Sequence, residues 1–273
     1  MSAIEQYQLI GRGRTADIYS WNDDQVLKLF HEWCSAESIA HELSASRLVE
    51  GAGLPVPMVE DEVVDIGGRH GLIYERVSGP SMLTALLHKP WQVRRYGRLM
   101  AELHASIHRC SAPQLPCFSV RLKNSIGAAR RLTAKLRQAA LQALAAREEG
   151  NTLCHGDFHP DNIIITAQGP RIIDWMNAVR GDPLTDVARS SLLLRMGEPL
   201  PGTSRRWLIN LIRSTFHSSY MNHYLFIRSA MRHDVDSWLL PVAAAKMDEN
   251  IESEADRLRE LIESLVDAAT PAA

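Results

Sequence analysis

The feature that most constrains this chain is a dense polar segment that is followed at once by two short apolar runs. Residues 155–162 read His-Gly-Asp-Phe-His-Pro-Asp-Asn, and the apolar runs 163–166 and 171–173 flank the turn-forming residues 167–170. Short β-branched runs on either side of a Gly-Pro turn are typical of a β-hairpin. Because helical periodicity surrounds this segment, the sequence predicts an isolated pair of antiparallel strands among helices.

Antiparallel pairing places the residue before the first strand and the residue after the second strand at one open end of a hairpin. Here those residues are Asn162 and Asp174, and Asp157 precedes Asn162 by five residues. Mg²⁺ prefers carboxylate and carbonyl oxygens, and a carboxylate outside the metal shell can orient and deprotonate an attacking hydroxyl. The segment therefore predicts phosphoryl transfer, with Asn162 and Asp174 as metal ligands and Asp157 as the catalytic residue.

Composition argues against several other classes of protein. The chain has 273 residues, 45% of them hydrophobic, and a net charge of only −2, which does not favour a general nucleic-acid binder. Its four cysteines form no CxxC pair, and we expect neither a signal peptide nor a membrane span. These features predict a cytoplasmic enzyme without nucleic-acid or membrane partners, and they leave its oligomeric state open.

The spacing of apolar residues changes from strand-like to helical near residue 78. Residues 7–30 alternate like strands, a helix is predicted from a cap at Ser35 to about Glu50, and two further strands are predicted near residues 58–64 and 72–76. Beyond the Ser-Gly-Pro at residues 78–80, helical spacing dominates, beginning with a helix over 91–109. We therefore predict a strand-rich domain over residues 1–77 and a mainly helical domain over residues 78–273.

The polar segment resembles the catalytic loop and metal-binding Asp of the protein-kinase-like fold, and the match is closest to the aminoglycoside phosphotransferase and choline kinase family. That family has His-Gly-Asp and Ile-Asp-Trp motifs, found here at residues 155–157 and 173–175. The resemblance implies an α+β bilobal fold, with a small antiparallel-sheet N-lobe carrying one helix and a larger, mainly helical C-lobe. It also implies Mg²⁺-dependent transfer of the γ-phosphoryl group of ATP or GTP to a hydroxyl of a small acceptor, aminoglycoside-like or an amino alcohol or sugar.

The resemblance further implies a nucleotide clamp in the N-lobe. Gly11 and Gly13 resemble a glycine-rich loop, although Ala16 stands where a third glycine is usual, and an ordinary hairpin turn is the alternative. Lys28 lies mid-strand among apolar residues, where it would need an anionic partner such as the nucleotide phosphates. An edge-strand lysine is the alternative reading.

Glu42 is implied as the acid that holds this lysine, and it is favoured over Glu37 because it adjoins Leu43 on the apolar side of its helix. The main-chain groups of Glu75 and Val77 resemble the hinge that binds adenine. The resemblance also implies two supporting residues. Asp186, near the start of a helix, would brace the catalytic loop, and His155 would support it.

Two other functions compete with this interpretation. The histidines and carboxylates of the polar segment could hold two metals in a phosphohydrolase, although the N-terminal lysine would then have no role; this cluster comprises His155, Asp157, His159, Asp161 and Asp174. His159 and Asp161 also fit loop-capping or solvated positions. A nucleotide-binding pseudokinase is the second alternative, although the lysine, the catalytic acid and both metal ligands are intact.

The sequence leaves the acceptor open. The short interval from Asp174 to Asp186 has no Ala-Pro-Glu motif, which disfavours a protein substrate. Three acids are spaced as one helical stripe, either to attract a cationic acceptor or as a solvated face: Asp248, Glu252 and Asp256. Four aromatic residues either box a quaternary ammonium group or belong to the core: Trp175, Tyr220, Tyr224 and Trp238.

Overall fold

The computed structural model describes residues 4, 6–196 and 206–269. They form two compact units, one of Met1–Ala85 with Pro160–Ala178 and the other of Leu86–His159 with Val179–Ala273. This division differs from the predicted boundary at residue 77, because the hairpin belongs with the N-terminal sheet. Backbone hydrogen bonds explain the difference: the Ile165 N–H donates to the Pro80 carbonyl (2.9 Å) and the Ile172 N–H to the Pro55 carbonyl (2.7 Å).

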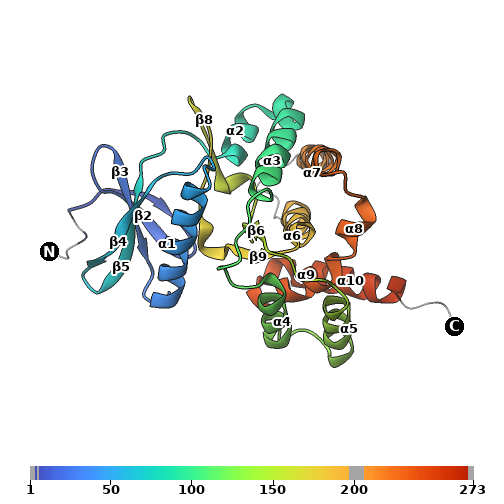
Figure 1. The fold of residues 1–273 in the computed structure, drawn as a ribbon. Helices are drawn as coiled ribbons and strands as arrows, with labels where there is room; N and C mark the ends of the chain where they lie inside the picture. The colour runs from blue at the N-terminus through green and yellow to red at the C-terminus, as the bar shows by residue number, and fades with distance from the viewer. Residues whose placement is uncertain (1–3, 5, 197–205, 270–273) are drawn as a thin grey trace. The chain divides into compact units, whose positions relative to one another are not determined.

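The first unit is built on a five-stranded antiparallel sheet with the strand order β1-β2-β3-β5-β4. Helix α1 (Ala36–Gly51) packs against β4 and β5 (Figure 1). The hydroxyl of Ser35 accepts the Ser38 N–H at 3.2 Å, which confirms the predicted cap. The strands are β1 (Leu9–Arg12), β2 (Ala16–Ser20), β3 (Gln25–Phe30), β4 (Val59–Ile66) and β5 (Arg69–Glu75).

Strand β3 runs through the middle of this sheet, and its alternation separates two small cores. Leu27 and Leu29 pack with Ile73 on one face. Phe30 packs on the other face with Ala16 and the α1 residue Ile39, in a second cluster. Since side chains alternate along a strand, Lys28 shares the helix-covered face with Phe30.

The predicted hairpin is present as β7 (Ile163–Thr166) and β8 (Gly169–Ile172), paired antiparallel with Thr166 opposite Gly169. Single 3-10 turns precede and follow it, η2 (Pro160–Asn162) and η3 (Trp175–Asn177). Gly79 lies so close to the hairpin that a Cβ there would meet the Ile165 carbonyl oxygen at 2.2 Å. The first unit also includes the beginning of α2 (Met82–His88).

The second unit is mainly helical, as predicted. Helices α3 and α7 pack side by side, and a short pair of strands, β6 (Thr152–Cys154) and β9 (Val179–Gly181), joins the helices (Figure 1). The helical elements are η1 (Pro90–Gln92), α3 (Val93–Ile107), α4 (Phe118–Ala128), α5 (Ala134–Ala145), α6 (Pro183–Met196), α7 (Arg206–Arg228), α8 (Arg232–Asp236), α9 (Leu239–Lys246), η4 (Met247–Glu249) and α10 (Glu252–Ala269). Among the described residues, the helices lack the combination of length and apolar character that crossing a bilayer requires.

The predicted helix over 91–109 corresponds to the turn η1 followed by α3. The helical spacing of five residues predicts one apolar face: Val93, Tyr96, Met100, Leu103 and Ile107. Val93 is half-buried, and the other four are buried. The acidic stripe proposed for Asp248, Glu252 and Asp256 does not exist as one helical face. Asp248 lies in η4, Asn250 adopts a left-handed conformation with φ of 53°, and α10 begins only at Glu252.

Candidate active site

The first unit holds a buried lysine between two carboxylates. The Lys28 ammonium lies 2.5 Å from Glu42 Oε1 and 2.8 Å from Asp174 Oδ1. Glu42 is fully buried on α1, whereas Glu37 is exposed, so the structure places the predicted acid and not its competitor beside the lysine. The Tyr74 hydroxyl also donates to Glu42 Oε1, at 3.0 Å.

Burial and charge oppose each other in this cluster. Burial by itself would lower the pKa of Lys28, but the carboxylates of Glu42 and Asp174 outweigh it and raise that pKa. Burial raises the pKa of Glu42 although Lys28 opposes the shift. The lysine is therefore a cation near neutral pH, and it contacts Asp174 at the end of the hairpin.

The hairpin brings the two predicted metal ligands to one end. The Ile173 N–H donates to the Asn162 carbonyl at 3.0 Å, which extends the ladder by one pair. Asn162 and Asp174 therefore both lie at the open end of the hairpin. Asp174 adopts φ of 66°, a region that residues other than glycine seldom occupy and that often marks functional sites. Its side chain remains 37% exposed, so it is accessible to a cation while it contacts Lys28.

The predicted glycine-rich loop is a tight hairpin turn between β1 and β2. The Gly13 N–H donates to the Ala16 carbonyl at 2.8 Å, and a Cβ on Gly13 would lie only 2.9 Å from that oxygen. Ala16 itself is buried in the core cluster with Phe30. Gly11 pairs with Ile18 inside the ladder. The turn thus requires glycine at residue 13 and a small core residue at residue 16, which accounts for the missing third glycine.

The predicted hinge begins at Glu75, the last residue of β5. The Glu75 N–H donates to the Met58 carbonyl at 2.9 Å, and its carboxylate accepts the Met58 N–H at 3.2 Å. Any contact of the Glu75 main chain with a base would therefore have to use its carbonyl oxygen. Val77 lies two residues beyond and is half-buried.

Asp157 lies in the second unit, where Arg189 of α6 holds it. Arg189 Nη2 donates to Asp157 Oδ1 at 3.2 Å and to Glu249 Oε1 at 2.9 Å, and Arg189 Nε donates to the Gly156 carbonyl. His159 Nε2 lies 3.6 Å from the other carboxylate oxygen of Asp157. The sequence predicts that Asp157 lies close to Asn162 and Asp174, and this proximity stays a prediction.

These contacts keep Asp157 ionised. Burial by itself would raise the pKa of this carboxyl, but the hydrogen bond from His159 and the charge of Arg189 lower the pKa well below its usual range. A carboxylate with so low a pKa is a weak base. It is suited to accepting a hydrogen bond from a hydroxyl and aiming it, with the proton leaving late in the transfer.

Asp186 lies under the catalytic loop as a fully buried carboxylate. Its Oδ2 accepts the His155 N–H at 2.6 Å, and its Oδ1 accepts the Gly156 N–H at 3.0 Å. These bonds fit the predicted bracing role. Burial by itself would raise the pKa of Asp186, but the hydrogen bonds that it accepts from His104 and His108 lower the pKa well below its usual range.

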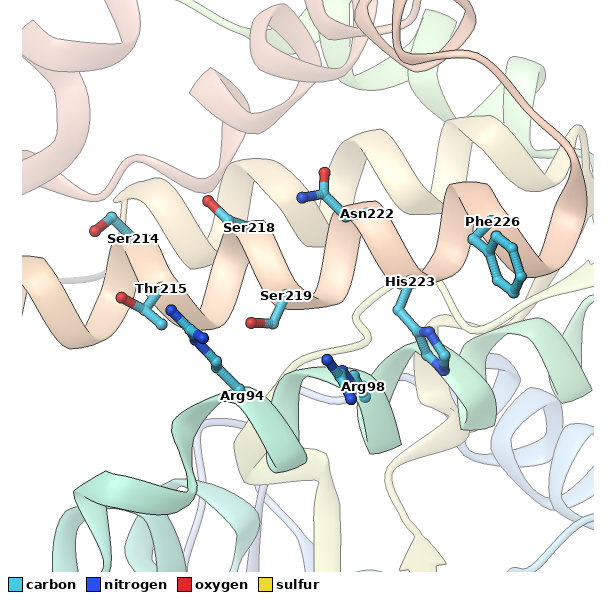
Figure 2. Close-up of a pocket in the computed structure, with 9 residues that line it drawn as sticks. All are labelled: Arg94, Arg98, Ser214, Thr215, Ser218, Ser219, Asn222, His223 and Phe226. Carbon is cyan, nitrogen blue, oxygen red and sulfur yellow. The ribbon is translucent and has the colours of Figure 1, made fainter.

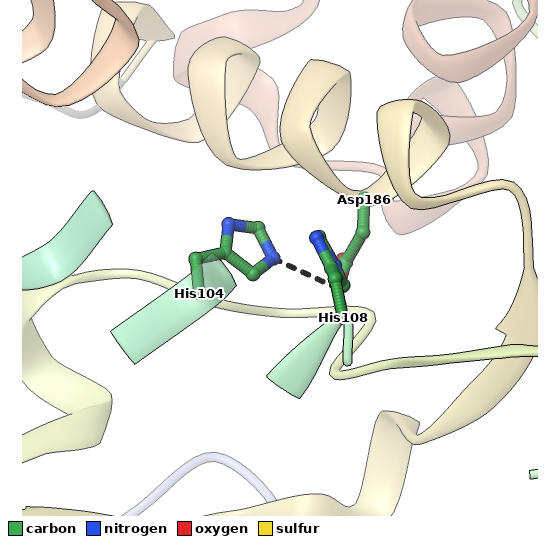
Figure 3. Close-up of side chains that lie close together, drawn as sticks. All are labelled: His104, His108 and Asp186. Atoms are coloured by element: carbon green, nitrogen blue, oxygen red, sulfur yellow. Dashed lines mark hydrogen bonds and ion pairs between the residues drawn. The ribbon is translucent and has the colours of Figure 1, made fainter. Parts of the chain in front are cut away.

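Two histidines lie beside Asp186, as Figure 3 shows: His104 in α3 and His108, the residue that follows the last residue of α3. His104 Nε2 lies 3.1 Å and His108 Nε2 lies 3.4 Å from Asp186 Oδ2. Each ring has its other nitrogen 2.7 Å from a tyrosine hydroxyl of α7, Tyr220 for His104 and Tyr224 for His108. Each ring donates to the carboxylate through Nε2 and bonds a tyrosine through its other nitrogen, so both nitrogens of each buried ring have a partner.

The aromatic residues considered as an ammonium box are core residues instead. Tyr220 and Tyr224 are fully buried and engage the two histidines, and Trp238 is 4% exposed. Trp175 is likewise buried, within the first unit. Asp161 accepts the Ser81 hydroxyl at 2.9 Å, which agrees with a loop-capping position. His159 contacts Asp157, as described above.

Sequence reasoning missed Arg189, Glu249, His104 of α3 and His108, which follows the last residue of α3. Arg189 follows Asp186 by three residues on one helix, so helical spacing could have placed both beneath the same loop. His104 and His108 are four residues apart and lie beside the buried Leu103 and Ile107. Polar residues on an apolar helix face were the available signal, because buried imidazoles require partners. Glu249 gave no such signal in the sequence.

Comparisons with known proteins agree with this geometry. Residues 6–205 match the model of the phosphotransferase enzyme family, APH. A curated relative, the mouse (Mus musculus) acyl-CoA dehydrogenase family member 10, is 27% identical over 195 residues, which cover 61% of this chain. The chain spans only 18% of the length of that relative.

Three solved structures share the fold at low sequence identity. A thermostable mutant of the aminoglycoside phosphotransferase APH(4)-Ia superposes with a TM-score of 0.68, 14% identity and coverage of 97% of this chain and 95% of that one. A choline/ethanolamine kinase family protein from Mesorhizobium loti superposes with a TM-score of 0.62 and 17% identity, and the match covers 97% of this chain and 88% of that one. The amicoumacin kinase hAmiN, in complex with AMP-PNP, Ca²⁺ and Ami, superposes with a TM-score of 0.62 and 14% identity, and the match covers 99% of this chain and 91% of that one.

The predicted α+β protein-kinase-like fold is thereby confirmed, with its antiparallel sheet and helix α1 in the first unit and its mainly helical second unit. The family match covers well over half of the chain and includes the turn at Gly13, the buried Lys28 and the catalytic loop. The chain belongs to the phosphotransferase enzyme family.

Proposed function

We propose that this protein transfers the γ-phosphoryl group of ATP or GTP to a hydroxyl of a small molecule. The proposal depends on one observation: Lys28 lies between a buried carboxylate, Glu42, and a partly exposed one, Asp174. A lysine held in this way is a fixed cation for nucleotide phosphates. A phosphohydrolase built on the His/Asp cluster would have no use for it.

The residues of the first unit would bind and orient the nucleotide. The turn at Gly13 presents backbone close to the phosphates, and the ammonium of Lys28 neutralises phosphate charge. The oxygens of Asn162 and Asp174 fit Mg²⁺, since both are hard donors at one end of the hairpin and the Asp174 side chain is partly exposed. When bound there, Mg²⁺ would supply charge neutralisation at the transferred phosphoryl group.

Asp157 would orient the acceptor hydroxyl for in-line attack. Arg189 and His159 keep its carboxylate ionised and fixed, so it can accept the hydroxyl proton. Asp186 fixes the backbone on the N-terminal side of Asp157 through the His155 and Gly156 amides. Positioning and electrostatic stabilisation would therefore provide most of the rate enhancement.

Complexes of related folds support the nucleotide and cation assignments. APH(4)-Ia has been solved with AMP-PNP and hygromycin B, and hAmiN with AMP-PNP and Ca²⁺. We accordingly assign an adenine or guanine nucleoside triphosphate as phosphoryl donor and a hydroxyl-bearing small molecule as acceptor. Aminoglycosides, amino alcohols and sugars are the acceptor classes to test.

The test is Mg²⁺-dependent formation of ADP and GDP by the purified protein across a panel of aminoglycosides, choline, other amino alcohols and sugars. Turnover that needs one acceptor and disappears in Asp157→Ala supports the proposal and names the acceptor class. Asp161→Ala is the matched control, because it removes a neighbouring acid and should retain turnover. Nucleotide binding without turnover on any acceptor would favour the pseudokinase alternative.

A further inference from the structure

A groove of about 570 Å³ lies between α3 and α7 in the second unit. Figure 2 shows its lining: Arg94 and Arg98 project from α3 toward a row of polar side chains on α7. None of the residues assigned above to nucleotide, metal or acceptor binding lines this groove. Its volume lies within the range of about 300 to 1,000 Å³ that small-molecule sites occupy.

The groove gathers hydrogen-bond donors that are otherwise unused. Arg94 and Arg98 are exposed, one helical turn apart, and form neither an ion pair nor a hydrogen bond with any other residue that the structure describes. Within the same described part of the chain, the side chains of Ser218, Ser219 and Asn222 likewise have no hydrogen-bond partner. Two guanidinium groups beside hydroxyl and amide groups make a surface that favours an anion.

The other end of the groove is aromatic. Phe226 is 81% exposed, and its ring is stacked on that of His223, with centroids 6.5 Å apart and an angle of 14° between the planes. The acid at this end, Glu102, accepts a hydrogen bond from His223 Nε2 at 2.9 Å. Figure 2 shows Phe226 at one end of the row and Arg94 toward the other. The positive charge and the aromatic surface are therefore separated along the groove.

The walls of the groove are set by a close helix crossing. Gly97 lies between the two arginines, and a Cβ at this position would come 2.8 Å from the Phe216 carbonyl oxygen and 2.8 Å from Ser219 Cβ. The backbones of α3 and α7 are thus in direct contact, which leaves little freedom in the spacing between the guanidinium groups and the polar row. A preformed groove loses less entropy when it binds a ligand.

We propose that this groove is a second binding site, for a small phosphate ester that carries a planar ring. The phosphate would take the donors of Arg94, Arg98 and the neighbouring hydroxyl groups, and the ring would lie on Phe226. The two ends require both parts of such a ligand: a bare anion would leave the aromatic surface uncovered, and a neutral ring would leave the arginines unpaired. The site is independent of the proposed kinase activity.

Calorimetric titration with phenyl phosphate, inorganic phosphate and phenol tests this site. The double variant R94Q/R98Q should bind phenyl phosphate about tenfold more weakly, because each arginine contributes charge-assisted hydrogen bonds. Arg95→Gln is the matched control: Arg95 lies on the same turn but outside the groove lining, where it contacts Gln92, and its removal should leave affinity unchanged. Phosphate bound elsewhere contributes equally to all of these proteins and cancels in the comparison.

Phe226→Ser gives a second readout that does not depend on charge. In this variant the preference for phenyl phosphate over inorganic phosphate should disappear, while the affinity for inorganic phosphate stays as in the wild type. The proposal is overturned if R94Q/R98Q binds phenyl phosphate as the wild type does, or if Arg95→Gln loses as much affinity as the double variant. It is also overturned if phenol alone binds as well as phenyl phosphate. Because no turnover is measured, these outcomes are separate from the test of the kinase activity.

Discussion

Asp174 in the first unit and Asp186 in the second are both acids with close polar partners, but their surroundings differ. The Asp174 side chain is 37% exposed and contacts the ammonium of Lys28. The Asp186 side chain is fully buried and accepts hydrogen bonds from two imidazole rings and two backbone amides. A carboxylate that must exchange partners with a metal keeps a side open to water, whereas one that fixes a loop has all its acceptor sites engaged.

The same contrast appears in what each acid does to its neighbours. Lys28 and Asp174 form a pair whose members can both contact a ligand, and Asp174 stays in a strained backbone conformation. Asp186 instead links α3, α6 and the catalytic loop through groups that no ligand can reach. Mutations at the two acids should therefore separate ligand binding from folding, and the following predictions are ordered by expected effect.

Asp186→Asn should have the largest effect, and it should act on stability. An amide offers one acceptor oxygen and turns an N–H₂ toward donors that Asp186 now satisfies, so at least one buried donor is left unpaired. The expected loss is about 3 kcal/mol or more in the free energy of unfolding, measured by urea denaturation. Asp182→Asn, four residues earlier at the start of the same helix, is the control and should lose far less. Equal losses would contradict the central position of Asp186.

Glu42→Gln should weaken nucleotide binding, since it removes the buried charge that holds the Lys28 ammonium. A hydrogen bond between charged partners contributes about 1.5 to 3 kcal/mol, so the affinity should fall about tenfold or more in a fluorescence titration with AMP-PNP and Mg²⁺. Glu37→Gln alters an exposed acid of the same helix and should bind as the wild type does. If the Glu37 variant were the weaker binder, the assignment of the lysine partner would be wrong.

Stability should fall as the pH falls from 7 to 5. Burial and then the charge of His104 lower the pKa of His108 from 6.5 to about 3, so the unfolded chain takes up a proton below pH 6.5 that the folded chain refuses until about pH 3. The group therefore stabilises the fold above pH 6.5, and by pH 5 about 2 kcal/mol of that contribution is lost. In urea denaturation, His108→Gln should reduce the pH dependence of the free energy of unfolding, whereas His233→Gln, which alters an exposed histidine, should not. The reverse result would contradict a buried, neutral imidazole at residue 108.

Arg189→Gln should shift the pH dependence of catalysis. The Arg189 charge helps to lower the pKa of Asp157, so its removal raises that pKa and moves the acid limb of the kcat/KM profile to higher pH. Arg131→Gln, which removes a surface ion pair with Glu252, should leave the profile unchanged. An unshifted limb in the Arg189 variant would show that Arg189 does not set the charge state of Asp157.

Local patterns in the sequence were sufficient for much of this fold. The cap at Ser35, the hairpin around residues 167–170 and the apolar face of α3 each depend on nearby residues, and each is present. The pairing of Lys28 with Glu42 could be predicted from the resemblance to the kinase-like fold, and a mid-strand lysine needs an anion in any case. The division of the chain into two units could not be predicted, because it depends on hydrogen bonds from the hairpin to Pro55 and Pro80, which are far away in sequence.

The buried polar network was beyond what the sequence could indicate. His104 and Tyr220 are 116 residues apart, and their bond depends on how α3 and α7 pack. The aromatic residues suggested for ligand binding fill this core, since a tyrosine ring is easily buried once its hydroxyl has a partner. The acidic stripe was wrong for a local reason, because the left-handed residue Asn250 interrupts the helix on which it was placed.

The most direct test of the account compares Asp157→Asn with Asp174→Asn by calorimetric titration of AMP-PNP at several Mg²⁺ concentrations, with turnover measured on the acceptor found in the panel. Asp157→Asn should bind the nucleotide with wild-type affinity and Mg²⁺ dependence but should lose turnover by a factor of about 10² to 10⁴. Asp174→Asn should lose the Mg²⁺-dependent part of nucleotide binding as well. Wild-type turnover in either variant, or unchanged Mg²⁺ dependence in Asp174→Asn, would contradict the assignment of these two acids.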